Sequence, residues 1–219
     1  MPYSIDPDVA RVRDWLASRP DTESVANFVP GPGIQKLDLK LDIGLLQSAL
    51  AEILTRTEYQ GDHQDQGFAA IALTRRPDDE TISANDLSGR YWLRADERYQ
   101  EEAMEDIVDE AGFSEFVPEF RGTYFEKVHQ LLTDRFTIGR MRILSKGLYN
   151  CNSWHRDPEP RLHIPVVSNP GSLFVVNHHC THLPADGSVY FTDTRGYHMA
   201  MNGGLNRRVH IVAALPLEQ

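Results

Sequence analysis

The chain is poor in cysteine and contains no long apolar run. Two cysteines, Cys151 and Cys180, are too few for a disulfide framework, which favours a reducing location. No stretch approaches the roughly 18 apolar residues that a membrane span requires. The first residues also lack the basic start and the apolar core of a signal peptide. We therefore expect a cytoplasmic protein that does not cross a membrane.

Positive charge is also scarce. The chain has 22 Lys and Arg residues against 32 Asp and Glu residues, a formal net charge of −10. Proteins that bind the phosphate backbone draw affinity from Lys and Arg, so this balance argues against nucleic acid as a partner. Much of the acidic excess lies in residues 96–110, and charge runs of this kind usually form a solvated surface. We expect the same of this segment.

The composition is that of a globular protein, with 41% hydrophobic and 25% charged residues in a chain of 219. The first 60 residues are predicted to be helical, with a turn-rich connection over 28–34. Asp6 is placed to cap a first helix, and Asp42 opens a second one that extends to about Arg56. The next expected elements are a buried strand over 67–74, a loop over 78–98 and a third helix over 118–134.

After residue 136 the pattern changes to short strands separated by turns. The predicted strands are 137–144, 161–167, 172–177, 188–192, 197–201 and 208–215. Asp186-Gly187 and Asn202-Gly203-Gly204 are typical of hairpin turns. Such spacing favours a sandwich or barrel, and helices that precede strands favour helices packed against an antiparallel β core. We expect a single domain over 1–219, with a helical and mixed support region in 1–135 and the functional β strands in 136–217.

Histidine is concentrated in the second half of the chain, where seven of nine histidines lie between His155 and His210. In extended backbone, residues i and i+2 point to the same side, so His155 and Asp157 can converge on one metal ion. His198 follows 41 residues after Asp157. Two imidazoles and one carboxylate form the set typical of Fe(II) sites with open coordination positions. The same donors also suit Mn(II) and Zn(II).

Two other histidine segments compete for this role. His63-Gln64-Asp65 repeats the His-x-Asp pattern in a polar segment, but no Arg-x-His pair follows it closely. His178-His179-Cys180-Thr181-His182 contains three imidazoles and a thiol within five positions. We interpret the latter as histidines of a loop rather than a second metal site.

Two Arg-x-His pairs follow the His155-x-Asp157 pair. Arg161 and His163 open one predicted strand with both side chains on one face, and Arg208 and His210 do so in the last strand. An arginine on the inner face of a β core is costly unless an anion pairs with it. A dicarboxylate could bind the metal and pair with the arginine at once, since one end chelates a metal and the other binds a guanidinium. The alternative is that each arginine reaches solvent or an acidic side chain of the protein.

Three segments together carry a family resemblance. Residues 154–165, 197–202 and 208–212 resemble the aspartyl/asparaginyl β-hydroxylase-like branch of Fe(II)/2-oxoglutarate dioxygenases, which includes bacterial cis-proline hydroxylases. The likeness spans roughly 140–215, with a weaker echo at 59–73, and its specificity lies in the order and spacing of the motifs. Residues 78–115 have no counterpart in it.

The resemblance implies a double-stranded β-helix, or jelly roll, with His155, Asp157 and His198 as the Fe(II) ligands. Arg208 would bind the distal carboxylate of 2-oxoglutarate, with His210 beside it. Arg161 and His163 match a pair that lines the co-substrate pocket in this branch.

The implied reaction consumes O2 and 2-oxoglutarate, releases succinate and CO2, and hydroxylates an unactivated C–H bond. The substrate would be an amino acid or a residue within a peptide or protein. Because Asp157 is present, no coordination position is freed for halide, which disfavours a halogenase. Arg156 and Arg195 flank the ligands in sequence and are candidates for holding a substrate carboxylate, with solvated surface arginines as the alternative.

Two other function classes stay open. A non-catalytic, cupin-like protein that binds a metal or a small ligand would keep the β core but would not need Arg208. A metalloenzyme independent of 2-oxoglutarate, such as a Zn(II) or Mn(II) isomerase or hydrolase, would use the same three metal ligands.

Overall fold

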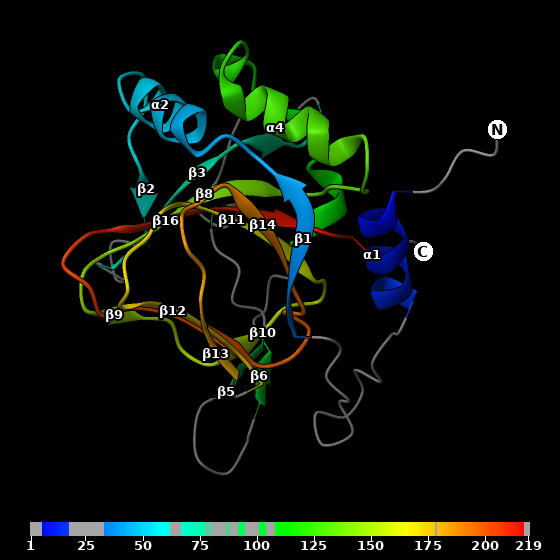
Figure 1. The fold of residues 1–219 in the computed structure, drawn as a ribbon, viewed down its shortest axis with the longest axis vertical. Coiled ribbons are helices and arrows are strands. Elements are labelled where there is room, and N and C mark those ends of the chain that lie inside the picture. Colours follow the sequence, from blue (N-terminus) through cyan, green and yellow to red (C-terminus); the bar gives the residue numbers. More distant parts are fainter. Residues whose placement is uncertain are drawn as a thin grey trace.

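The fold is built mainly of strands, which form two sheets that lie one above the other (Figure 1). The computed structural model describes residues 6–17, 33–61, 67–77, 79, 87, 92–94, 101–103, 108–177 and 179–216. Every strand pairing within these ranges is antiparallel. None of the helices described there has the length and apolar character needed to cross a membrane.

The strands of the first sheet, in spatial order, are β1 (Ile34–Lys40), β14 (Ser188–Thr192), β11 (Arg161–Val167), β16 (Arg208–Ala214), β8 (Met141–Lys146), β3 (Phe68–Ala72) and β2 (Gln60–Gly61). Those of the second are β13 (His179–His182), β12 (Ser172–Val176), β15 (His198–Asn202), β10 (His155–Arg156), β5 (Trp92–Arg94) and β6 (Glu101–Ala103), with β9 (Asn150–Cys151) also paired to β15. From β8 onward the chain passes back and forth between the two sheets. This is the topology of a double-stranded β-helix.

The remaining elements lie outside these sheets. They are the helices α1 (Pro7–Ala17), α2 (Ile43–Ile53) and α4 (Tyr124–Thr133), the 3₁₀ turns η2 (Glu110–Gly112) and η3 (Pro118–Phe120), and the short strand pair β4 (Thr74–Arg75) and β7 (Glu115–Phe116). Helices α2 and α4 lie over the outer face of the first sheet, on the side away from the second (Figure 1).

The two predicted N-terminal helices are confirmed. Asp42 caps α2, because its Oδ1 accepts a hydrogen bond from the backbone N–H of Leu45 at 3.0 Å. Asp6 plays the same part for α1, accepting from the N–H of Asp8 at 2.9 Å. Helix α2 ends at Ile53 rather than near Arg56, since the following residues form a turn.

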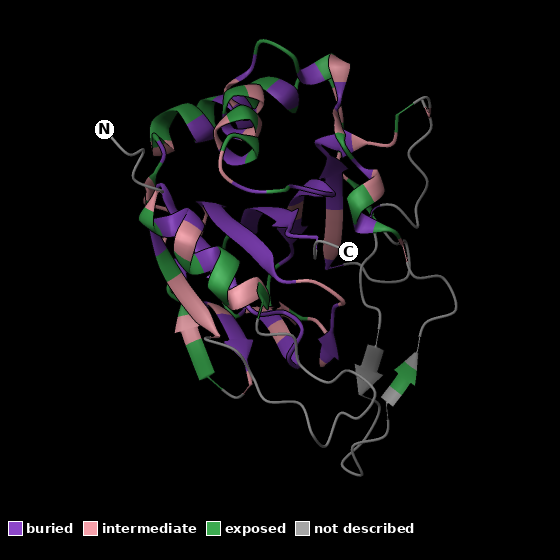
Figure 2. Cartoon of the chain, turned by 90° about the vertical axis from the view of Figure 1, so that its right-hand side faces the viewer, coloured by how far each residue is buried: buried purple, intermediate pink, exposed green. Residues whose placement is uncertain are grey.

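The first sheet has one apolar and one polar face, and both are buried. In β11, Leu162 and Ile164 join the core beneath the helices, whereas Arg161 and His163 point to the other side, between the sheets. Strand β16 repeats this alternation. Figure 2 shows the strands of the interior as almost wholly buried, while the helices expose one side. The predicted placement of each Arg-x-His pair on one strand face is therefore confirmed.

The helical prediction for the first 60 residues is wrong at β1. Residues 34–40 pair with β14, with Gln35 opposite Phe191, and Leu37 packs into the core. The alternation of Leu37 and Leu39 with polar residues is the local sign of this strand. The β core is consequently not confined to 136–217, because β1, β2 and β3 complete the first sheet, and β5 and β6 extend the second.

Two predicted loops contain strands. β5 lies within the predicted loop 78–98 and pairs with β10, and the predicted histidine loop forms β13, the edge strand beside β12. In each case sheet pairing supplies the hydrogen bonds that the local sequence does not signal. The predicted third helix, over 118–134, is divided into η3 and α4, which are separated at Gly122, where φ is +81°.

The two predicted hairpins are also wrong. The turn at Asp186-Gly187 exists, and Gly187 has the positive φ of +85° that favours glycine. However, it joins β13 to β14, which belong to different sheets, and Asn202-Gly203-Gly204 likewise joins β15 to β16. Both segments are crossings of the jelly roll.

Helix α2 gives a direct test of the helix-covered core, because neighbouring leucines have opposite environments. Leu46 is fully buried, whereas Leu45 is 48% exposed. We expect Leu46→Ala to lower the free energy of unfolding by about 2–5 kcal/mol through lost burial and the resulting cavity. Leu45→Ala, with the same change of side chain, should stay within about 0.5 kcal/mol of wild type. Urea denaturation measures both, and equal losses would contradict this packing.

Candidate metal centre

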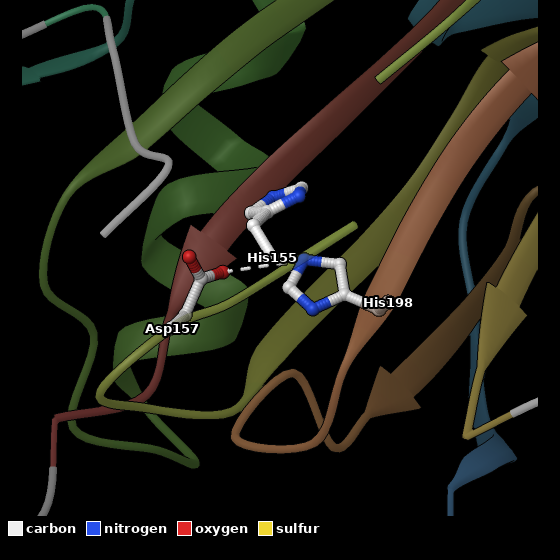
Figure 3. A group of neighbouring side chains, drawn as sticks. All are labelled: His155, Asp157 and His198. Carbon is white, nitrogen blue, oxygen red and sulfur yellow. Dashed lines mark ion pairs between the residues drawn. The ribbon is translucent and has the colours of Figure 1, made fainter. Parts of the chain in front are cut away.

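His155, Asp157 and His198 come together between the sheets. His155 in β10 lies directly opposite His198 in β15, and Asp157 follows β10 by one residue. One potential ligand atom from each side chain lies within 4.8 Å of the others, and all three residues are buried. Figure 3 shows the two rings and the carboxylate close together, with a dashed line between His198 and Asp157. The His198 Nε2 lies 3.6 Å from the Asp157 Oδ2.

Backbone carbonyls fix how the two imidazoles present their nitrogens. The Nδ1 of His155 lies 2.8 Å from the carbonyl oxygen of Ser153, and the Nδ1 of His198 lies 3.1 Å from that of Gly196. A carbonyl only accepts hydrogen bonds, so each Nδ1 must carry a proton, and in the neutral imidazole each Nε2 keeps its lone pair. This is the tautomer and the outer-shell arrangement of histidines that bind a metal through Nε2.

Asp157 contributes an oxygen, Oδ1, that no described residue binds. Its Oδ2 accepts a hydrogen bond from the Arg161 Nε at 2.8 Å, whereas its buried Oδ1 has no hydrogen-bond partner among the described residues. Burial raises the pKa of Asp157, but the Arg161 guanidinium and the two imidazoles outweigh it and lower the pKa overall. One anionic oxygen and two imidazole lone pairs therefore converge, and a divalent metal ion fits this donor set.

The turn that precedes β15 holds two of these ligands. The backbone N–H of Asp157 donates to the carbonyl oxygen of Thr194 at 2.8 Å, and Gly196 supplies the carbonyl that meets His198. A Cβ atom at Gly196 would lie only 2.5 Å from the Asn177 Oδ1. A residue larger than glycine at position 196 would therefore have to displace the Asn177 side chain.

The two arginines predicted to hold a substrate carboxylate are both buried. Arg195 places its Nε and Nη2 on the two oxygens of Asp193, at 2.7 and 3.0 Å, and also donates to the carbonyl oxygen of Trp15 at 3.2 Å. Arg156 lies in β10 opposite Trp92 and is 5% exposed. The solvated-arginine alternative is therefore wrong for both, and their substrate role stays a prediction.

Arg208 is buried on the inner face of β16 without an acidic partner among the described residues. Its recorded hydrogen bond runs from Nη2 to the Nδ1 of His210 at 3.0 Å. Burial lowers the pKa of Arg208 to about 9, and no carboxylate of the described residues opposes this effect. A buried guanidinium is costly unless an anion pairs with it, so this position favours an anionic ligand.

A chain of ring contacts connects Arg208 to the metal-ligand candidates. The Arg208 guanidinium carbon lies 6.0 Å from the ring centre of Phe174, which in turn lies 5.7 Å from that of His198. The His163 ring lies 4.7 Å from Phe174 and 5.8 Å from His210. The Arg208 guanidinium and the metal-ligand candidate His198 thus lie against the same Phe174 ring.

The neighbouring imidazoles of His163 and His210 carry uncharged polar atoms. Because His210 accepts from Arg208 through Nδ1, its proton lies on Nε2, which has no hydrogen-bond partner among the described residues. The Nδ1 of His163 likewise has none there. Burial first, and then the charge of Arg208, hold the pKa of both imidazoles well below the usual range. Both rings are accordingly neutral.

A buried network behind Asp157 escaped the sequence prediction. Glu110 in η2 is fully buried and binds Arg140 through both carboxylate oxygens, at 2.6 and 2.8 Å, while Arg161 donates to it from Nη2 at 2.8 Å. Burial raises the pKa of Glu110, but Arg161 and Arg140 outweigh it and hold the pKa far below its usual range. The predicted solvated surface is therefore wrong at Glu110, and no local pattern marked this residue.

The competing histidine segments are not assembled into a second centre within the described residues. His63-Gln64-Asp65 and His178 lie outside those residues. His179 and His182 stand on β13 with Cys180, and Cys180 is exposed. Within the described part of the chain, the one group of three side chains with metal-binding geometry is His155, Asp157 and His198.

The sequence matches no family model and no curated protein. Solved structures do resemble it. An oxidoreductase of the 2OG-Fe(II) oxygenase family from Burkholderia pseudomallei aligns with a TM-score of 0.51 and 16% identity, over 92% of this chain and 88% of that one. A prolyl-4-hydroxylase from Pseudomonas putida aligns with a TM-score of 0.50 and 11% identity, over 95% and 99%. The predicted fold class is confirmed: this chain has the double-stranded β-helix fold of these oxygenases, with helices packed against it.

Proposed function

We propose that this chain is an Fe(II)- and 2-oxoglutarate-dependent dioxygenase that hydroxylates an unactivated C–H bond. The observation that carries the proposal is Arg208, a buried guanidinium without an acidic partner among the described residues, which lies against the same Phe174 ring as the metal-ligand candidate His198. A 2-oxo dicarboxylate could bind both the metal and Arg208, since its 2-oxo acid group chelates a metal and its distal carboxylate pairs with the guanidinium.

His155 and His198 would hold Fe(II) through Nε2, and Asp157 through Oδ1, the oxygen left open by Arg161. The bound iron would supply the oxidative chemistry by which O2 and 2-oxoglutarate give succinate, CO2 and a hydroxylated product. Arg208 binds the distal carboxylate, and the Nε2–H of His210 is a second donor beside it.

Arg161 and His163 complete the proposed pocket in different ways. His163 lines it as a neutral ring packed on Phe174. Arg161 uses Nε and Nη2 for Asp157 and Glu110, so its predicted contact with 2-oxoglutarate stays a prediction.

The proposed substrate is an amino acid or a residue within a peptide or protein. Support comes from the resemblance of residues 154–165, 197–202 and 208–212 to the aspartyl/asparaginyl β-hydroxylase-like branch, and from the similar structure named as a prolyl-4-hydroxylase. Arg156 is our candidate for holding a substrate carboxylate, because it directly follows one metal-ligand candidate and precedes the other.

Metal binding tests the first part of the proposal. His155→Ala, Asp157→Ala and His198→Ala should each weaken Fe(II) binding by more than the roughly 10- to 100-fold typical of losing an outer-shell partner. His179→Ala is the matched control, since His179 is exposed on β13. Anaerobic titration with Fe(II) gives the affinities. A triad variant that binds Fe(II) as wild type does would remove that residue from the ligand set.

Arg208→Met tests the co-substrate. We expect the visible charge-transfer band of 2-oxoglutarate chelated to Fe(II) to require about 30-fold more 2-oxoglutarate, since losing one partner of a buried charge pair costs about 2 kcal/mol or more. Arg207→Met, at an exposed neighbour that donates to the Ser145 Oγ, should leave the titration unchanged. Unchanged affinity in Arg208→Met would overturn the carboxylate assignment but not the metal site.

Stability gives the Arg208 assignment an independent measurement. Without 2-oxoglutarate, Arg208→Met should melt at a higher temperature than wild type, because it removes a buried, uncompensated charge. With 2-oxoglutarate and a divalent metal, only the wild type should gain stability. A variant less stable than wild type under both conditions would mean that Arg208 is satisfied within the protein.

The other function classes predict different results in the same samples. A cupin-like binding protein takes up metal but releases no succinate when O2 is admitted. A metalloenzyme that does not use 2-oxoglutarate gives no charge-transfer band. The absence of both band and succinate in the wild type would overturn the dioxygenase proposal.

A further inference from the structure

Two buried arginines each bind a carboxylate through two neighbouring N–H groups of the guanidinium. Arg140 places Nε and Nη2 on the two oxygens of Glu110, at 2.8 and 2.6 Å. Arg195 does the same with Asp193, at 2.7 and 3.0 Å. This two-point pairing is the favoured geometry because two parallel charge-assisted hydrogen bonds form at once.

Arg161 departs from this geometry. Its Nε donates to Oδ2 of Asp157 at 2.8 Å, but its Nη2 donates to Oε1 of Glu110, also at 2.8 Å. In Arg140 and Arg195, the Nε and Nη2 groups both bind the same carboxylate. In Arg161, they bind two different carboxylates. As a result, Oδ1 of Asp157 has no hydrogen-bond partner among the described residues, although it is buried.

We propose that Glu110 is a positioning residue that holds the second donor of Arg161 away from Asp157 and so keeps Oδ1 open for the metal ion. This role rests on the proposed function, because it concerns the metal ion proposed there. Without Glu110, the Nε and Nη2 of Arg161 are free to close over both oxygens of Asp157, as Arg195 closes over Asp193. The guanidinium then competes with the metal for its carboxylate ligand.

The surroundings keep Glu110 in this position. Its side chain is fully buried, as is that of Arg140, so neither group exchanges its partner for water. Arg140 fixes both oxygens of Glu110, and Oε1 still accepts from Arg161. Arg140, Glu110, Arg161 and Asp157 therefore form one chain of charged hydrogen bonds that ends at the open oxygen.

A double-mutant cycle on Co(II) binding tests this role. Co(II) is titrated into the full-length wild type, Glu110→Gln, Arg161→Gln and the double variant, with affinity from calorimetry and the ligand field from the visible spectrum. We expect Glu110→Gln to weaken Co(II) binding by about 10- to 100-fold, the usual effect of losing an outer-shell partner. In the Arg161→Gln background the same change should alter affinity by less than about threefold, because the competing donor is gone.

Glu115→Gln is the matched control. Glu115 lies five residues from Glu110 and also pairs with an arginine, Arg75 at 3.0 Å, but in the separate β4 and β7 pair. Its substitution should leave Co(II) affinity and spectrum unchanged. If Glu110→Gln does not fold, Glu110→Leu combined with Arg140→Met removes the buried pair together and takes its place in the cycle.

Equal losses in both backgrounds would show that Glu110 acts by its own charge, and would overturn the positioning role, as would unchanged affinity in Glu110→Gln. These outcomes are distinct from failure of the proposed function. A wild type that binds Co(II) but shows no coupling loses only the role of Glu110. A wild type that binds no Co(II) loses the metal centre itself.

Discussion

Arg161 donates to two carboxylates at once, and the arrangement of the interior depends on this shared pairing. One carboxylate is a metal-ligand candidate, Asp157, and the other, Glu110, comes from a distant turn fixed by Arg140. Charges buried between two sheets must be paired, because isolated ions are costly to remove from water. The network pairs all four of these groups and leaves one oxygen of Asp157 for a cation.

The strands of the first sheet bury apolar side chains on one face and polar side chains on the other. The outer faces of β11 and β16 pack apolar residues under the helices, and this contact supplies the stability of the fold. Their inner faces carry Arg161, His163, Arg208 and His210. Among the described residues, Arg208 has no acidic partner, and His163 Nδ1 and His210 Nε2 have no hydrogen-bond partner. The stability of the apolar layer offsets the cost of these polar groups, as in many binding sites.

The features that the sequence predicted correctly are those that depend on short-range periodicity. The i and i+2 spacing of His155 and Asp157, and of both Arg-x-His pairs, was sufficient to place each set on one strand face. Glu110 and Arg140 were missed because their pairing spans 30 residues, and that of Glu110 with Arg161 spans 51, with no local pattern to mark it. β1 and β13 were missed because edge strands with many polar residues gain their definition from the neighbouring strand. The hairpin turns were recognised as turns, but the sheet to which each strand belongs is a property of the whole topology.

The two ends of the proposed pocket belong to different sheets. The imidazoles of the metal centre come from β10 and β15, whereas Arg208 comes from β16 in the opposing layer. Phe174 packs between the Arg208 guanidinium and the His198 ring, so the distance between these two groups is fixed by the packing of the protein. If iron and 2-oxoglutarate bind as proposed, the pocket would select its diacid by length, because a diacid one carbon shorter or longer would fail to contact both ends.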